Sequence, residues 1–391
     1  MTAFGSIVTF TNLFPSAAMP RHGLFVRERM RRVAAATGAS WQVVCPVPLV
    51  PKWLRRRPID RAFATMPAEE WLDGVHVHHP RYRHVPGFSM RRQAERMADG
   101  TRELVTALCR ERPVVLDAHY LYPDGVAALR LARELDVPCF VTARGSDVNV
   151  VGRDPRIAAQ IRAVASGARR LFAVAAPLCK ALADLAGVAE ERVTLVRNGV
   201  DLERFAPGDR SAARDRLGLP QDASLVAGVG RLVRGKGFHV MAKALRKLDA
   251  RVHFVVAGDG PEREVLESLA PRGRLHLLGA RSPDDVACLL RAADLLVLPS
   301  ESEGWPNVVT EALASGVPVV ATAVGAVPEM LASPLAGALV RAGDAEVLAR
   351  EVARVLGMPR DPARIAAWGR RFSWDEPIAT LECAFREAFA A

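Results

Sequence analysis

Short apolar segments that alternate with helices constrain the fold of this 391-residue chain more than any other feature. Residues 295–298 read LLVL, and a run without polar alternation is typical of a parallel strand covered on both faces. Helical segments separate the successive runs, so the sequence predicts doubly wound parallel sheets of the α/β class. The predicted strands are residues 6–10, 41–45, 75–79, 114–117, 139–142, 171–174, 193–196, 224–229, 252–257, 274–278, 294–298 and 317–321.

A turn and a linker divide this alternation into two parts. The turn is N-G-V-D at 198–201 and the linker is A-P-G-D at 206–209, after which strands and helices restart. We therefore predict two doubly wound domains, residues 1–205 and 206–372, with a last helix of about 373–391 that joins the first domain. Ligands of such sheets bind beyond the carboxyl ends of the strands, so we expect a cleft where the two domains face each other.

The net charge of +10 is placed unevenly along the chain. Residues 1–205 contain 30 Lys and Arg against 20 Asp and Glu, whereas residues 206–391 contain 23 of each sign. Within the first domain, residues 21–112 carry 18 basic and 9 acidic side chains. A basic domain beside a neutral one predicts an anionic partner for the first domain only.

The basic segments 52–57 and 81–96 also contain aromatic side chains, Trp53, Tyr82 and Phe88. Two interpretations stay open. The segments are either solvated basic faces or a patch that binds an anionic membrane surface and so reaches a lipid-linked acceptor. Nucleic acid binding is not predicted, because the sequence contains no stacking platform or recognition motif.

The six cysteines are scattered without a C-x-x-C pair, so we predict reduced thiols rather than a disulfide framework or a zinc site. The sequence has no apolar run of membrane-spanning length, and its first residues lack a basic leader. These features predict a cytoplasmic protein, either free or attached peripherally to the inner face of the cytoplasmic membrane.

A glycine-rich segment, G-V-G-R-L-V-R-G-K-G at 228–237, follows one predicted strand and precedes a helix. Its first two glycines let the backbone approach a ligand closely, and Arg231 and Lys236 place two cations beside that ligand. The segment is not G-x-G-x-x-G, because Val233 replaces the third glycine, and it lacks the G-K-[ST] of a P-loop. By itself it is equally consistent with a turn that bears solvated charges.

Two acids mark the loop and helix predicted at residues 300–315. Glu303 lies at the loop–helix junction and Glu311 two turns along the helix, roughly 12 Å apart at about 1.5 Å rise per residue. That separation is too large for a shared proton or a single metal ion. It suits one extended ligand held at two points, with its anionic centre at the helix N-terminus.

These segments together resemble the family 4 retaining glycosyltransferases, which have the GT-B fold of two Rossmann-like domains. The resemblance covers nearly the whole chain, and Glu303 and Glu311 fall on the two glutamates of the family's E-x7-E motif. The matching segments are G-x-G-R-L-x-x-x-K-G at 228–237, A-G-D-G-P at 257–261, N-G-V-D at 198–201 and S-x-x-E-G-x-x-N-x-x-x-E-A-x-A-x-G-x-P-V-V at 300–320.

The resemblance implies transfer of a sugar from a nucleotide-sugar donor to a polysaccharide or lipid-linked glycan acceptor. It implies that Glu311 holds the ribose hydroxyls and that Glu303 faces the donor sugar. It also implies that two cations hold the diphosphate, assisted by backbone N–H groups from Gly304 to Asn307. The donor-binding residues are then Gly230, Arg231, Lys236, Glu303, Gly304, Trp305, Pro306, Asn307 and Glu311. The catalytic residues are then His119, Arg231, Lys236 and Glu303.

The chemistry of such a transfer requires that a diphosphate leaving group be stabilised while the anomeric carbon gains positive charge. Preorganised cations and a helix dipole supply that stabilisation. Because no D-x-D occurs in the sequence, we expect no metal, with Arg231 and Lys236 in place of a metal clamp. No cofactor is expected beyond the cosubstrate, a UDP- or GDP-sugar. The resemblance also implies a front-face mechanism that retains the anomeric configuration.

In the first domain the resemblance is less complete. His119, in D-A-H-Y-L-Y-P-D-G at 117–125, matches a family region, and would line the cleft and assist proton transfer unless its role is structural. Arg144 stands where the family commonly has His, and Asp147 is expected to orient the site or a nearby loop. Only one glycine of the family's pair is present in the N-terminal loop. The residues predicted on the acceptor or cleft side are Gly23, Arg144, Asp147 and Asn198.

Three other functions compete with sugar transfer as interpretations of this sequence. A sugar-nucleotide epimerase of the same fold is the main alternative, since it would use the same donor site. A nicotinamide-dependent oxidoreductase is disfavoured by the missing third glycine and its acidic ribose partner. A non-catalytic partner subunit is disfavoured by the intact motifs.

Overall fold

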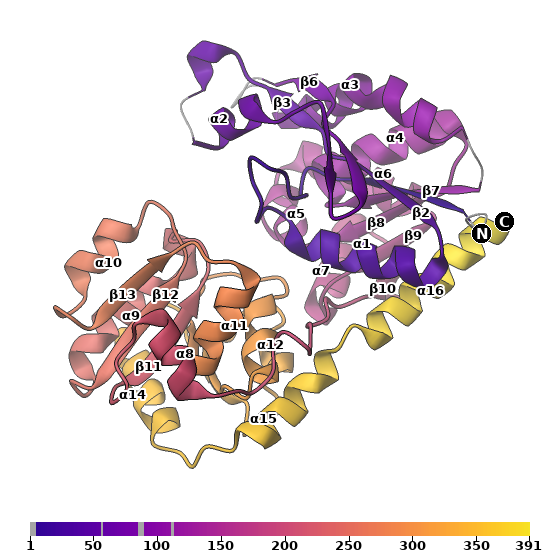
Figure 1. Cartoon of the computed structure of the whole chain (residues 1–391). Helices are drawn as coiled ribbons and strands as arrows, with labels where there is room; N and C mark the ends of the chain where they lie inside the picture. Colours follow the sequence, from indigo (N-terminus) through magenta and orange to yellow (C-terminus); the bar gives the residue numbers. More distant parts are fainter. Residues whose placement is uncertain (1–4, 56–57, 85–89, 111–112) are drawn as a thin grey trace. The chain divides into compact units, whose positions relative to one another are not determined.

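The chain forms two compact units, each built on a parallel sheet covered by helices (Figure 1). Unit 1 is Met1–Arg197 together with Asp375–Ala391, and unit 2 is Asn198–Trp374. Parallel sheets with helices on both faces make each unit a Rossmann-like domain. The computed structural model describes residues 5–55, 58–84, 90–110 and 113–391.

The main sheet of unit 1 contains eight strands within the described residues, seven of them parallel. Strand β7 at its centre is buried at every residue, as expected for a strand covered on both faces. In spatial order the strands are β10 Val193–Leu195, β9 Arg170–Ala173, β8 Cys139–Ala143, β7 Val114–His119, β1 Ser6–Phe10, β2 Ser40–Val44, β5 Val75–His78 and β4 Glu69–Leu72.

The edge strand β4 is antiparallel to β5, which differs from the wholly parallel sheet predicted from the sequence. Asp73 and Gly74 join the two strands with φ of 50° and 80°. Two central residues with positive φ form the tight turn whose twist matches that of a hairpin. A separate parallel pair is formed by β3 Val47–Leu49 and β6 Arg81–Arg83.

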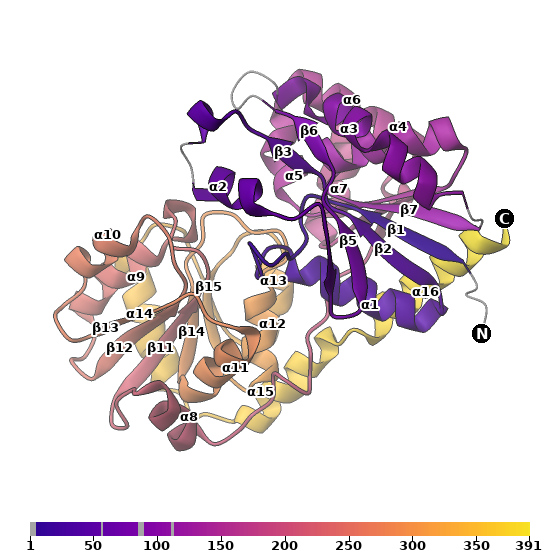
Figure 2. The same cartoon turned by 45° about the horizontal axis from the view of Figure 1, so that its top comes forward.

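The last helix of the chain packs in the core of unit 1. Helix α16, Asp375–Ala390, lies beside α1, Leu24–Thr37. Figures 1 and 2 show both on one side of the sheet, with α3, Gln93–Leu108, and α4, Val126–Leu135, on the other. Phe385 of α16 meets Phe140 of β8 edge to face, with ring centroids 4.8 Å apart. Such buried aromatic pairs stabilise a core beyond their area alone.

The remaining helices of unit 1 connect the strands of its sheet. The α-helices are α2 Pro58–Thr65, α3 Gln93–Leu108, α4 Val126–Leu135, α5 Ser146–Asn149, α6 Pro155–Gly167 and α7 Ala176–Ala186. Short helical turns lie at Lys52–Leu54, Met90–Arg92, Leu121–Gly125, Val151–Arg153 and Glu190–Arg192.

The sheet of unit 2 is wholly parallel in the described residues. Its buried residues Val226, Phe254 and Val297 pack against Met241 of helix α9, Phe238–Ala244, and Val352 of helix α14, Ala345–Leu356. In spatial order the strands are β13 Leu275–Gly279, β12 Val252–Ala257, β11 Ser224–Val229, β14 Leu295–Leu298, β15 Val319–Thr322 and β16 Gly337–Val340.

The helices of unit 2 pack in two groups. Helix α9 contacts α10 and α14, whereas α11 contacts α8 and α12, and α12 contacts α15. The helices are α8 Arg210–Leu217, α9 Phe238–Ala244, α10 Arg263–Leu269, α11 Pro283–Ala292, α12 Asn307–Ala314, α13 Val327–Met330, α14 Ala345–Leu356 and α15 Pro362–Gly369. Short turns lie at Arg234–Lys236, Leu245–Lys247 and Arg370–Phe372.

The N-G-V-D turn belongs to unit 2, so the division falls at 197/198 rather than at the predicted 205/206. The backbone N–H of Val200 donates to the carbonyl of Phe372 at 2.8 Å. Gly199 lies against Trp374 so closely that a Cβ would come 2.5 Å from the indole ring. These contacts attach the turn to the end of unit 2 rather than to the sheet before it.

Candidate active site

The glycine-rich segment leaves the carboxyl end of β11 and packs tightly against the A-G-D-G-P loop. A Cβ on Gly258 would come 1.8 Å from the carbonyl oxygen of Gly230, and one on Gly260 would come 2.5 Å from that of Leu232. Gly230 itself has φ of 149°. Side chains at these positions would separate the two loops, which explains why both motifs require glycine.

The same segment is joined to the loop that carries Glu303. Gly237 has φ of 69°, and a Cβ there would lie 1.9 Å from the carbonyl oxygen of Pro299. The N–H of Glu301 donates to the carbonyl of Gly235 at 2.9 Å. The two sequence motifs, more than sixty residues apart, therefore form one structure at the carboxyl ends of β11 and β14.

Two of the predicted catalytic residues form an ion pair in this structure. Lys236 Nζ donates to Glu303 Oε1 at 2.7 Å, and the side chains are 27% and 10% exposed. Arg231 stands exposed in the same segment. A phosphate that approached this edge would meet two cations, one of which already balances a mostly buried carboxylate.

Helix α12 starts at Asn307, four residues after Glu303, with Pro306 at its cap position. Helix N-termini present free backbone N–H groups that bind anions. Pro306 has no N–H, so of the four predicted backbone donors only Gly304, Trp305 and Asn307 can serve. The indole of Trp305 is buried and meets Phe372 edge to face at 6.0 Å, so that side chain packs in the interior of unit 2.

Asn198 lies in unit 2 rather than in the first domain, and its place on the acceptor or cleft side stays a prediction. Its Nδ2 donates to Oδ1 of Asn307 at 3.1 Å. The N-G-V-D turn therefore positions the start of α12. The spacing of these residues in the sequence, over one hundred positions, gave no signal of this contact.

Glu311 lies on α12, one turn after the start of the helix, and is half-buried. Burial raises the pKa of its carboxyl from 4.5 to about 7, and the charge of Arg204 opposes that rise. In the described part of the chain Glu311 forms neither an ion pair nor a side-chain hydrogen bond. A desolvated carboxylate without a protein partner is the kind of group that a ligand hydroxyl can satisfy.

His119 is fully buried at the carboxyl end of β7 in unit 1. Arg144 NH2 donates to its Nδ1 at 2.7 Å, and its Nε2 lies 3.0 Å from Oδ2 of Asp117. Burial lowers the pKa of His119 to about 4, with Asp117 opposing and Arg144 reinforcing that shift. The imidazole is therefore neutral at pH 7. Its catalytic role stays a prediction.

Asp147 and Arg144 are buried beside this histidine. Asp147 accepts hydrogen bonds from the backbone N–H groups of Leu121, Arg144 and Gly145 at 2.8 to 3.3 Å. It thereby holds the loops after β7 and β8 together. Burial lowers the pKa of Arg144 to about 10, while Asp117 and Asp147 raise it, so the guanidinium stays charged.

Gly23 is the last unit 1 residue of the predicted site. It precedes α1 with φ of 69°, and a Cβ would come 2.2 Å from the carbonyl oxygen of Leu13. The N-terminal loop therefore folds back on itself only with glycine here. Asn12 N–H donates to Oδ1 of Asp124 at 2.5 Å, which ties the same loop to the segment after β7.

A cavity of about 370 Å³ in unit 2 lies away from these motifs. Its lining includes Ser224, Asp294, Pro318 and Gly337, which stand at the amino ends of β11, β14, β15 and β16. Ligands of doubly wound sheets bind at the carboxyl ends, so we place the donor site at the motif loops and not in this cavity.

The basic segments only partly match the membrane interpretation. Tyr82 is buried and its hydroxyl accepts from Gln93 at 2.9 Å, so it offers no surface to a bilayer. Phe88 and residues 56–57 lie outside the described residues. Trp53 is 76% exposed beside the exposed Lys52. Among the described residues, no helix is both long enough and apolar enough to cross a membrane.

Comparison with known proteins agrees with this geometry. The model of Glycosyl transferases group 1 matches residues 209–372, and that of Glycosyltransferase Family 4 matches residues 52–204. TuaC of Bacillus subtilis (strain 168), named as a teichuronic acid biosynthesis glycosyltransferase, is 33% identical over 361 residues, 89% of this chain and 88% of TuaC. A D-inositol 3-phosphate glycosyltransferase of Mycolicibacterium paratuberculosis is 37% identical over 212 residues, 50% of this chain and 48% of that protein.

Solved structures share the fold at lower identity. Sucrose-phosphate synthase from Thermosynechococcus elongatus aligns with a TM-score of 0.79 and 20% identity, over 98% of this chain and 99% of that one. Anabaena Alr3699/HepE, solved in complex with UDP-glucose, aligns with a TM-score of 0.70 and 18% identity over 98% of both chains.

Two Rossmann-like units with these motif loops define the class of GT-B glycosyltransferases. The chain belongs to glycosyltransferase family 4, and it is a glycosyltransferase. The family assignment does not favour the epimerase alternative.

Proposed function

We propose that this glycosyltransferase uses a nucleotide-sugar donor bound at the motif loops of unit 2 and transfers the sugar with retention and without a metal ion. The ion pair of Lys236 with Glu303 beside the start of α12 carries this proposal. It brings a cation, an acid and backbone N–H groups together at the edge of the sheet where ligands bind.

The leaving diphosphate is stabilised by fixed charges. Lys236 and Arg231 supply two cations, and the first N–H groups of α12 supply a positive dipole end. Groups that are already in place when negative charge develops lower the barrier because nothing has to reorganise at that moment. The diphosphate draws Lys236 away from Glu303, whose carboxylate then faces the donor sugar.

Glu311 binds the ribose of the donor. Its carboxyl is desolvated in the apo protein, and two neighbouring hydroxyls of a ribose would donate hydrogen bonds to it. Those bonds favour the charged carboxylate and so lower its pKa when the donor binds.

Names of similar proteins support the donor and acceptor classes. The Anabaena structure contains UDP-glucose, which supports a UDP-sugar as donor, with a GDP-sugar as the alternative. TuaC is named for teichuronic acid biosynthesis, which supports a polysaccharide or lipid-linked glycan as acceptor. The net positive charge of residues 1–205 fits an anionic acceptor.

A thermal-shift screen of UDP-, GDP- and ADP-sugars tests the donor. A true donor binds only the folded state and raises the melting temperature with its concentration. Transfer is then followed by NMR of the anomeric proton, with and without EDTA. Retained configuration and unchanged turnover in EDTA are expected. Inverted product, or loss of turnover that Mg²⁺ restores, would contradict the retaining, metal-independent reaction.

The exposed side chains of Trp53 and Lys52 support peripheral attachment to the anionic inner face of the cytoplasmic membrane. Flotation with vesicles that contain or lack phosphatidylglycerol measures this attachment directly. We expect flotation only with the anionic vesicles, and a Trp53→Ala variant should float less. A wild-type chain that fails to float with either vesicle contradicts the membrane part of the proposal and leaves the donor site unaffected.

A further inference from the structure

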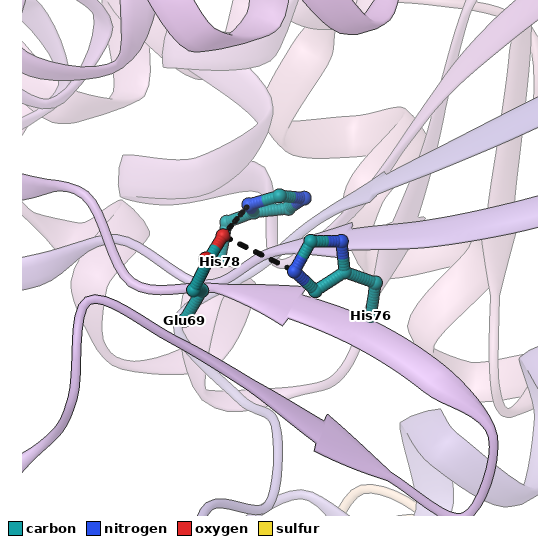
Figure 3. A group of neighbouring side chains, drawn as sticks. All are labelled: Glu69, His76 and His78. Atoms are coloured by element: carbon teal, nitrogen blue, oxygen red, sulfur yellow. Dashed lines mark ion pairs between the residues drawn. The ribbon is translucent and has the colours of Figure 1, made fainter.

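The hairpin β4–β5 brings two histidines and a glutamate onto one face of unit 1, and none of the three belongs to the proposed donor site (Figure 3). His76 and His78 are two positions apart on β5, so their rings project from the same face of the sheet. Glu69 on β4 stands directly opposite His78 in the ladder. Figure 3 shows the Glu69 carboxylate directed between the two rings.

The distances between the ligand atoms are close to those around a bound metal ion. Glu69 Oε2 lies 3.2 Å from His76 Nε2 and 3.7 Å from His78 Nδ1, and the three atoms all lie within 4.8 Å of one another. Ligand atoms bound tetrahedrally at about 2.0–2.1 Å lie about 3.3 Å apart. Small rotations of His76 and Glu69, whose side chains are 23% and 63% exposed, would complete that geometry.

Gln42 on β2 sets the tautomer of His78. In the amide orientation of the structure, Gln42 Oε1 accepts from His78 Nε2 at 3.2 Å. The proton of the neutral ring is then on Nε2, and the lone pair of Nδ1 points toward the Glu69 carboxylate. Two electron-rich atoms facing each other are unfavourable unless a cation lies between them. A metal-bound histidine characteristically donates its other N–H in this way.

We infer that Glu69, His76 and His78 form a binding site for a divalent transition metal, with Zn²⁺ as the ion that two imidazoles and one carboxylate suit best. Water completes the coordination, because the site is open on the side of Glu69 and His76. The six cysteines, all free, contribute nothing to it. The sequence signal that could have revealed the site is H-x-H on a predicted strand, V-H-V-H at 75–78.

The metal fastens the edge of the main sheet. Glu69 belongs to the antiparallel edge strand β4, while His76 and His78 belong to its neighbour. On the opposite face of β4, Glu70 accepts from the N–H of Ala17 at 3.0 Å and pairs with His79 at 2.8 Å. A fixed β4 therefore also fixes the N-terminal loop that ends at Gly23.

Calorimetric titration of Zn²⁺ into the full chain, freed of any polyhistidine tag and stripped with chelator, tests the site. We expect one ion per chain. Glu69→Gln, at an exposed position that the fold does not need, and His76→Ala should each weaken binding at least about tenfold, and Gln42→Leu about 10–100-fold. His276→Ala is the matched control, because His253 and His276 form another close histidine pair, 2.9 Å apart, in unit 2.

Two readouts locate the ion independently of affinity. Trp71 stacks on His76 with centroids 4.7 Å apart, so Cu²⁺ at the site should quench its fluorescence, and Trp71→Phe should remove the quenched component. Amide exchange of residues 69–78 should slow when Zn²⁺ is present. Absence of Zn²⁺ binding by the wild-type chain, equal affinity in Glu69→Gln and wild type, or loss of binding only in His276→Ala would each overturn the proposal.

Discussion

Replacing Glu311 by Gln should make the protein more stable and a poorer enzyme. Burial raises the pKa of this carboxyl from 4.5 to about 7, so the folded state holds a proton more tightly than the unfolded state. Between these two values stability falls as pH rises, because the folded chain must give up a proton that the unfolded chain has already lost. Above pH 7 the charged carboxylate costs about 3 kcal/mol, at 1.36 kcal/mol per pKa unit.

Gln has nearly the same shape as Glu and carries no charge, so it avoids that cost. At pH 8 Glu311→Gln should therefore exceed the wild type by up to about 3 kcal/mol in unfolding free energy, and at pH 5 the difference should shrink to below about 1 kcal/mol. Donor affinity should move in the opposite direction. Hydrogen bonds to a charged acceptor contribute about 1.5–3 kcal/mol, so binding should weaken roughly 10- to 150-fold.

Urea denaturation of both proteins at pH 5, 6, 7 and 8 measures the first effect, and titration with the donor measures the second. Glu264→Gln, at an exposed carboxylate on α10, is the matched control and should change stability by no more than about 0.5 kcal/mol at any pH. A Glu311→Gln variant that is less stable than the wild type at pH 8, or whose stability difference does not depend on pH, would refute the reasoning.

Three further predictions concern charges and backbone at the same sites. Lys236→Met should lower turnover about 10²–10³-fold in the transfer assay, because it removes a cation that binds the diphosphate and leaves Glu303 without its ion-pair partner. Near-normal turnover would exclude Lys236 from the reaction. Gly237→Ala should destabilise the protein far more than Gly218→Ala. Both glycines have positive φ, but only at Gly237 would the new Cβ lie 1.9 Å from a backbone oxygen, so Gly218→Ala should cost only the αL strain of roughly 1–2 kcal/mol. Equal melting temperatures of the two variants would refute this. Burial lowers the pKa of His119 to about 4, so its contribution to stability is present above pH 6.5 and is lost as pH falls toward 4, by up to about 3 kcal/mol. Because protonation of Glu311 acts in the opposite direction over the same range, the effect is measured as the difference in urea midpoint between the wild type and His119→Asn, which should shift in favour of His119→Asn as pH falls from 7 to 4.5. A difference that does not change with pH would contradict it.

The buried strands could be predicted well because short apolar runs without polar alternation are typical of parallel strands covered on both faces. Strands β1, β11 and β12 have the predicted bounds. The strands that were missed, β3, β4, β6 and β16, are three or four residues long and lie at edges or outside the main sheets. Such strands form because a neighbour offers free backbone groups, and composition does not record that.

The site could be predicted to different degrees in the two units. The pairing of Lys236 with Glu303 follows from motifs that each end a buried strand, because carboxyl ends of parallel strands meet at one edge. The contact of Asn198 with Asn307 and the burial of Tyr82 could not be predicted, since both depend on how distant segments pack. The hairpin site of Glu69 was missed because its ligands come from two strands, one of which was not predicted.

The predicted site residues of unit 1 are less accessible to a ligand than those of unit 2. Arg231 is exposed and Lys236 keeps a quarter of its surface, so a diphosphate can reach both. His119 and Asp147 are fully buried, and their polar atoms face Arg144, Asp117 and backbone N–H groups. An enclosed imidazole with a pKa of about 4 is a weak proton acceptor, so we expect His119 to hold the ends of the strands in place rather than to take the acceptor's proton. We propose that the leaving phosphate of the donor takes that proton instead.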